Sequence, residues 1–166
     1  DVSPGWNLIG SLSSAIGSGS VTGLSPVVVV SNFFGYNGGY VVTDSLYPWR
    51  SYWVKVAGTG RLVMAKPPSA VAKDVPPDLL SDLNRLILRD VSGIQQQLYF
   101  GFNDTMNVQK YEMPPLQPPG GFDARFASGR MVDLARGNGS FDFPIRIASA
   151  AYPVTIRWEI RQQDVQ

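Results

Sequence analysis

Short runs of alternating apolar and polar residues, separated by glycine and proline, constrain the fold of this chain most strongly. The clearest run is VTIRWEIR at 154–161, whose apolar residues recur at every second position. They would share one face of a strand: Val154, Ile156, Trp158 and Ile160. The 17 glycines and 13 prolines fall between such runs and mark turns. Because alternation with one polar face is typical of antiparallel sheets, the sequence predicts an all-β fold.

Two further segments show the same alternation. FDFPIRI at 141–147 would turn Phe141, Phe143 and its isoleucines inward, and Pro144 predicts an edge strand or a bulge. The run 122–126 alternates with Asp123 and Arg125 outward. The Asn-Gly pair at 138–139 predicts a hairpin turn that joins 131–134 to 141–147.

Only the segment DLLSDLNRL at 78–86 has leucines at helical spacing, and two prolines precede it. We therefore expect at most one short helix, of two turns. The tract 66–78 contains four prolines and no aromatic residue, which is typical of a linker. The predicted organisation is a small β-rich unit at 1–66, a proline-rich linker at 67–78 and an antiparallel β-sandwich at 79–166, with the small unit packed on the sandwich.

A second proline run, MPPLQPPGG at 113–121, admits two interpretations. It could be a ligand for a proline-binding domain, or a stiff crossover between two strands of one sandwich. Proline fixes φ near the polyproline value, which predicts an extended connector, and the two glycines permit the turn that follows. The ligand interpretation is weaker because proline-rich ligands usually carry flanking basic residues, and the nearest basic residues here are Lys110 and Arg125. We favour the connector.

Composition excludes several classes of function. A formal net charge of +1 argues against a nucleic-acid partner, which needs clustered basic residues. No apolar run is long enough to predict membrane insertion. The chain has no cysteine and no histidine, which removes disulfides, zinc sites and imidazole-dependent triads. Its two glutamates, Glu112 and Glu159, show no paired-carboxylate pattern. We expect no enzyme activity, no cofactor and no bound metal.

Two groups of residues are candidate contact sites. Trp49, Tyr52 and Trp53 lie within five positions beside a glycine-rich hairpin and could stack on a sugar or anchor a protein partner. Packing between the two halves of the chain is the alternative explanation. The β-branched run of Val27, Val28, Val29 and Val30 could instead offer a sheet edge to a neighbouring molecule.

Several motifs together resemble a known type of module. The landmarks are GWNLIG at 5–10, FGYNGGYVVTDSLYPWRSYWVKVAG at 34–58, QQQLYFGF at 95–102, YEMPPLQPPGGFDARFASGR at 111–130 and YPVTIRWEI at 152–160. The last three motifs, in the C-terminal half, resemble a secreted, cell-surface β-sandwich module of Bacteroidetes–Chlorobi–Ignavibacteria-type proteins, often found next to a type IX secretion sorting domain. The first two motifs resemble a companion module of the same kind of protein. The residues at 49–51, Trp-Arg-Ser, replace the glycines usual before the Tyr-Trp pair.

The resemblance implies an extracellular or cell-surface location and a scaffolding or attachment role without shared catalytic residues. We therefore expect a non-catalytic structural module that works by protein–protein contact, as a surface scaffold or a self-assembling filament subunit. A carbohydrate-binding module is the alternative. The expected partners are identical copies or other cell-surface proteins, with glycan as a further possibility. Because residues 1–4 and 162–166 carry few apolar groups with which to dock on their own domain, a terminal segment could complete a neighbour's sheet and form a head-to-tail filament. The alternative is that the termini pack on their own monomer, and the sequence leaves both open.

Overall fold

The computed structural model describes residues 1–65, 79–118, 120–148 and 151–161. It divides into two compact units, 1–76 and 77–166, which are described separately below. The division falls within the predicted linker 67–78, whose residues lie outside the described ranges. Among the described residues the fold is all-β, and the helical segments are two short 3-10 turns, η1 (Ser18–Ser20) and η2 (Val108–Tyr111). Packing of the small unit on the sandwich remains a prediction.

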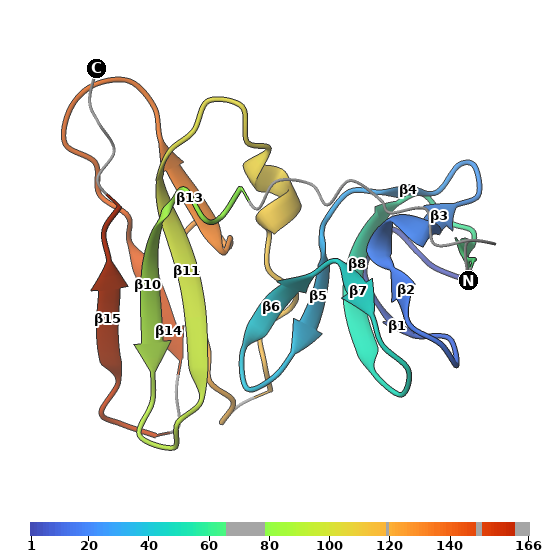
Figure 1. Cartoon of the computed structure of the whole chain (residues 1–166), viewed down its shortest axis with the longest axis horizontal. Helices are drawn as coiled ribbons and strands as arrows, with labels where there is room; N and C mark the ends of the chain where they lie inside the picture. Colours follow the sequence, from blue (N-terminus) through green and yellow to red (C-terminus); the bar gives the residue numbers. More distant parts are fainter. Residues whose placement is uncertain (66–78, 119, 149–150, 162–166) are drawn as a thin grey trace. The chain divides into compact units, whose positions relative to one another are not determined.

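The N-terminal unit is built around one antiparallel sheet (Figure 1). Its strand order is β1 (Gly5–Gly10), β8 (Ser51–Ala57), β5 (Phe33–Tyr36) and β6 (Tyr40–Thr43), and β4 (Val28–Val29) also pairs with β8. Two small pairs complete it: β2 (Ile16–Gly17) with β7 (Ser45–Leu46), and β3 (Val21–Gly23) with β9 (Leu62–Met64). Strand β8 buries Tyr52, Val54 and Val56 and leaves the alternate residues more exposed, as its sequence predicts.

The C-terminal unit has a four-stranded sheet and a two-stranded sheet. The larger has the order β13 (Val132–Ala135), β11 (Gln95–Phe102), β10 (Asn84–Arg89) and β15 (Thr155–Glu159). The smaller pairs β12 (Asp123–Phe126) with β14 (Ile145–Ala148). Phe143 joins the two, since its ring centroid lies 5.2 Å from that of Phe100 and 6.2 Å from that of Phe126. The sheets therefore pack face to face in a small sandwich.

The predicted helix at 78–86 is wrong. Residues 79–82 form a turn, and strand β10 begins at Asn84. Strand β10 pairs with β11 on one side and β15 on the other, so its backbone hydrogen-bonding groups have partners along both edges. Leu83 and Leu88 are fully buried. Tertiary pairing and burial therefore override the helical spacing of the leucines, whose propensity is only a weak local preference. Residue 78 lies outside the described ranges.

Asp123 and Arg125 do not point outward as predicted. Both are buried, and the Arg125 guanidinium donates to both carboxylate oxygens of Asp123, at 2.7 and 2.6 Å. A third bond runs from Arg125 Nη1 to the carbonyl oxygen of Pro114, at 3.0 Å. Met113 and Pro114, at the start of the proline run, are buried. The run thus lies against this side of β12 and removes it from solvent, which fits the interpretation of the run as a structural connector.

The Asn-Gly segment at 138–139 is not a hairpin turn. It lies in a bend after β13, which pairs in parallel with β11, whereas β14 pairs with β12 in the other sheet. The segment therefore crosses between sheets. The alternation predicted for 141–147 holds, because Phe141, Phe143 and the isoleucines are half-buried and the residues between them exposed. Pro144 lies just before β14, so its missing N–H removes no hydrogen bond from the β12–β14 pair.

Candidate functional site

The three aromatic candidates at 49–53 do not form one exposed surface. Tyr52 is only 3% exposed, belongs to the N-terminal core, and accepts a hydrogen bond from the Tyr47 N–H at 2.8 Å. Trp53 is half-buried and lies opposite Leu8 and Phe34 on the neighbouring strands. Trp49 is 99% exposed at the turn between β7 and β8, so it is the one ring of the three that is open to a ligand.

Trp49 also has an unusual backbone, with a φ of 62°. The left-handed region costs a bulky residue about 1–2 kcal/mol. Two residues close to it in sequence, Tyr47 and Arg50, line a surface hollow of ≈ 340 Å³ together with Tyr36. Both tyrosines are exposed. The aromatic rings and the guanidinium around this hollow are the chemistry that a sugar ring would need.

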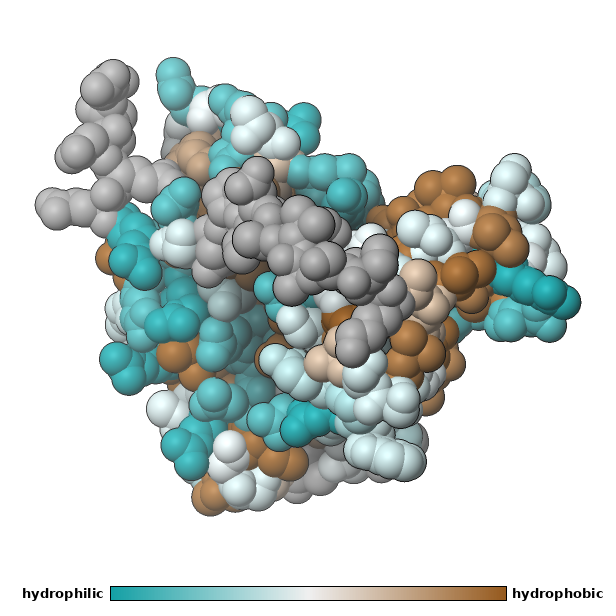
Figure 2. All heavy atoms as spheres, turned by 45° about the vertical axis from the view of Figure 1, so that its right-hand side comes forward, coloured by the Kyte–Doolittle hydropathy of each residue, from teal (hydrophilic) through white to brown (hydrophobic). Residues whose placement is uncertain are grey.

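The valine run at 27–30 is largely engaged within its own unit. Val27 is buried, Val28 and Val29 pair with Ala57 and Val56 of β8, and the Val30 N–H donates to Lys55 at 3.0 Å. The side chain of Val28 remains exposed. Figure 2 shows apolar residues gathered on the exposed surface of the N-terminal unit. The predicted role of the run in assembly is untested, but one of its backbone edges is already used.

The N-terminal segment docks on its own unit. Val2 is buried and exchanges two backbone hydrogen bonds with Gly60, at 2.8 and 3.0 Å. Asp1 pairs with Arg61 at 3.1 Å. For this segment the structure therefore favours the alternative of docking on its own unit, through one buried valine and a backbone bridge. Residues 162–166, the other predicted assembly segment, lie outside the described ranges.

The most exposed apolar stretch of the C-terminal unit is β15 and its extension. Trp158 is 65% exposed, Ile160 62% and Ile156 42%. Trp158 lies opposite Leu86 and Ile156 opposite Leu88, and cross-strand partners share a face of the sheet. Leu88 is fully buried, so this is the face covered by the smaller sheet. The cover ends before β15, which lies at the outer edge of the larger sheet (Figure 1).

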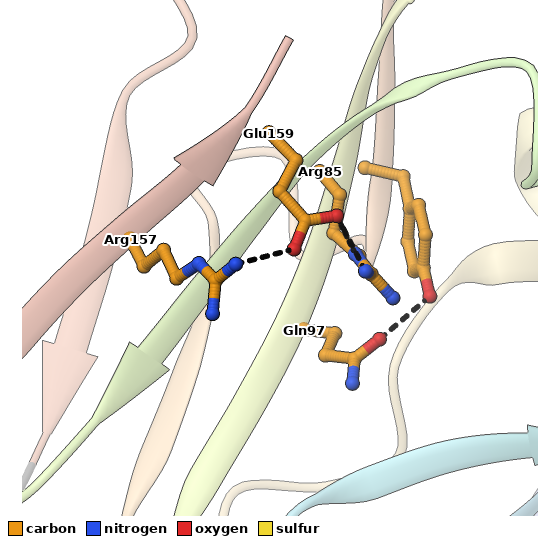
Figure 3. Close-up of polar contacts among 5 residues, drawn as sticks. Arg85, Gln97, Arg157 and Glu159 are labelled. Atoms are coloured by element: carbon orange, nitrogen blue, oxygen red, sulfur yellow. Dashed lines mark hydrogen bonds and ion pairs between the residues drawn. The ribbon is translucent and has the colours of Figure 1, made fainter. Parts of the chain in front are cut away.

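Over β10 and β15, the opposite face of the same sheet carries charged side chains. Arg85 on β10 donates to Glu159 Oε2 from Nε at 3.1 Å, and Arg157 Nη2 lies 3.5 Å from Glu159 Oε1 (Figure 3). On β11, the Tyr99 hydroxyl donates to Gln97 at 2.9 Å. The hydrogen bond from Arg85, followed by the attraction of nearby arginines, lowers the pKa of Glu159 below its ordinary value. The same bond raises the pKa of Arg85.

This polar face is poorly suited to acid–base catalysis. A carboxylate held by an arginine remains ionised near neutral pH and is a weak proton donor. Within the described ranges, no group of three or more acidic, cysteine or histidine side chains is placed to hold a metal ion. In the same residues, no helix is long and apolar enough to cross a membrane. The Asp123–Arg125 pair is buried and fully engaged, so it is structural.

Sequence reasoning missed the exposure of Ile156, Trp158 and Ile160. The alternation at 154–161 predicts that they share a face, which is what the register shows, but not whether anything covers that face. One signal was available: the other candidate strands, 122–126 and 141–147, are short. A sheet of two short strands covers a four-stranded sheet incompletely.

In comparisons with known proteins, no family model, curated protein or solved structure matches this chain. The class of protein therefore follows from the fold alone, which is an all-β chain of two units with a small sandwich at its C-terminal end.

Proposed function

We propose that this chain is a non-catalytic structural module that acts by binding other protein chains. Its role would be that of an extracellular or cell-surface scaffold, or of a self-assembling appendage subunit. One observation carries the proposal: the apolar residues of edge strand β15 are uncovered, with Trp158 65% exposed. An apolar strip beside a sheet edge is an aggregation hazard unless another chain covers it. The extracellular setting rests on the motif resemblance.

Sedimentation velocity over a wide concentration range tests the self-assembling form of this proposal. The intact chain should gain mass as its concentration rises, because association removes apolar surface from water. A single-chain mass at every concentration up to about 1 mM would reject self-assembly, since even a weak complex is populated there.

Carbohydrate binding is the second candidate, and the hollow lined by Tyr36, Tyr47 and Arg50 favours it. Stacking of exposed rings on a sugar would explain why Trp49 is held in a strained conformation at full exposure. A glycan array with the wild-type chain and the Tyr47→Ala and Trp49→Ala variants tests this. Specific binding that both substitutions abolish, without change in the circular dichroism spectrum, would support it. The absence of any array ligand would count against it.

A further inference from the structure

We propose that strand β15 pairs in antiparallel fashion with β15 of a second copy of this chain, about a twofold axis at Trp158. This inference rests on the proposed function, because it names the partner and the register of the protein contact. The four-stranded sheet would then continue across the axis into the partner's sheet. Such a contact is isologous and closes on itself as a dimer.

The backbone of β15 is directed correctly for this pairing. The Arg161 N–H donates to Asn84 Oδ1, at the start of β10, at 2.8 Å. In an antiparallel strand, alternate residues direct their N–H and C=O groups to opposite sides. The odd-numbered residues of β15 therefore face β10, and Ile156 and Trp158 direct their backbone groups to the other edge. In the part of the chain that the structure describes, no strand pairs with that edge.

Charge and apolar matching together select one register. An axis at Ile160 would also place Glu159 opposite an arginine, Arg161, but Trp158 would then lie opposite Gln162 in the sequence and lose its apolar partner. Charge decides among the three remaining axes that keep Trp158 opposite an apolar residue. With the axis at Trp158, Arg157 lies opposite Glu159 of the second copy, and this opposite-charge pair occurs twice. With the axis at Arg157, two arginines oppose one another. With the axis at Glu159, two carboxylates oppose one another and Arg157 faces an arginine. Like charges directly opposite one another destabilise a sheet, so the register about Trp158 is favoured.

The remaining positions of that register also match. The two Trp158 rings lie across the axis, and Ile156 lies opposite Ile160 of the second copy. These are the apolar side chains that the smaller sheet leaves exposed. Glu159 can accept the second copy's Arg157, because its Oε2 is held by Arg85 while its Oε1 has Arg157 of its own chain only at 3.5 Å. The strand is therefore complementary to itself on both faces.

A single cysteine tests the register directly, because the chain contains no cysteine of its own. In a hydrogen-bonded antiparallel pair, opposite Cα atoms lie about 5.5 Å apart, within the range of a disulfide. Trp158→Cys should therefore form a disulfide-linked dimer under mild oxidation. Ile156→Cys is the matched control: it is on the same strand and face, but its counterpart would lie about 13 Å away. A mixture of Ile156→Cys and Ile160→Cys chains should form the mixed dimer.

Sedimentation of Trp158→Lys provides an independent readout. Two lysines would oppose one another at the axis, so association should weaken by at least about tenfold. The matched control is Val91→Lys, which changes another exposed apolar residue of the C-terminal unit, outside β15, and should leave association unchanged. Circular dichroism of each variant checks the fold.

The outcomes separate the two proposals. Association of the wild-type chain that Trp158→Lys does not weaken, with no preferential cross-link at position 158, would overturn the β15 dimer and leave the protein-contact function standing. Equal cross-linking at positions 156 and 158 would also overturn the register. A wild-type chain that stays monomeric at all concentrations would remove the self-assembling function, and the dimer with it.

Discussion

The buried pair of Asp123 and Arg125 offers the sharpest test of how the C-terminal unit is held together. Replacing Arg125 by Met removes three donors, two to the Asp123 carboxylate and one to the Pro114 carbonyl oxygen. Asp123 is only 4% exposed, so its charge would be left buried without a partner. The proline run would also lose its bond to β12.

The expected cost is large. Removing one member of a buried ion pair typically destabilises a protein by about 3–5 kcal/mol. For a unit of this size, each kcal/mol lowers the melting temperature by about 4–8 °C, so a fall of roughly 12 °C or more is expected. Replacing both residues by apolar ones, as in Asp123→Leu with Arg125→Met, should cost much less, because no charge is then left buried.

Urea and thermal unfolding of the intact chain, followed by circular dichroism and by NMR signals of the C-terminal unit, would measure these effects. Arg157→Met is the matched control, because Arg157 is exposed and its contact with Glu159 is long. It should cost no more than about 1 kcal/mol, well below the effect of Arg125→Met. The reasoning is refuted if Arg125→Met lowers stability as little as Arg157→Met does. It is also refuted if the Asp123→Leu, Arg125→Met double variant is less stable than Arg125→Met alone.

Three further predictions concern the space beside a glycine, the strained backbone of Trp49 and the ionisation of Glu159. Gly23→Ala should destabilise the N-terminal unit by about 2 kcal/mol or more in urea unfolding, because its Cβ would lie 2.2 Å from a backbone oxygen. Gly10→Ala, with no atom within 4 Å, should change stability by less than about 0.5 kcal/mol, and equal effects would contradict this account. Trp49→Gly should raise stability by roughly 0.5–1 kcal/mol by relieving a φ of 62°, and a fall would contradict the assigned backbone strain. The Glu159 carboxyl should titrate below its ordinary value of 4.5 by NMR, and its pKa should rise in Arg85→Met, which removes the largest cause of the shift. Because the pKa of Glu159 is lowered in the folded state, its stabilising contribution is present above pH 4.5 and is lost as the pH falls through the lowered folded-state pKa. An unchanged pKa of Glu159 in Arg85→Met would contradict the assigned cause.

The all-β fold could be predicted from local pattern because a strand alternates its side chains between two faces. That geometry makes the burial of Tyr52, Val54 and Val56 along β8 readable from the residues alone. The half-burial of Phe141 and Phe143 follows for the same reason. Turns at glycine and proline are similarly local, since these residues limit or extend the allowed values of φ.

The errors arose where a distant segment decided the outcome. The leucines near residue 83 have helical spacing, yet pairing with β11 and β15 makes this segment a strand. Asp123 and Arg125 look solvent-facing in a single strand, but the chain at Pro114 covers them. In both cases the deciding contact comes from another segment of the chain, so the local residue pattern carries no information about it.

The candidate site shows the same division. The sequence by itself determined that Ile156 and Trp158 share one face of β15 and that Arg157 and Glu159 share the other, because side chains alternate at every residue. Only the tertiary structure decided that the apolar face is left uncovered and that the strand lies at an edge of its sheet. Cover and edge position depend on which strands pair and how far the opposing sheet extends, and these are properties of contacts between residues far apart in the chain.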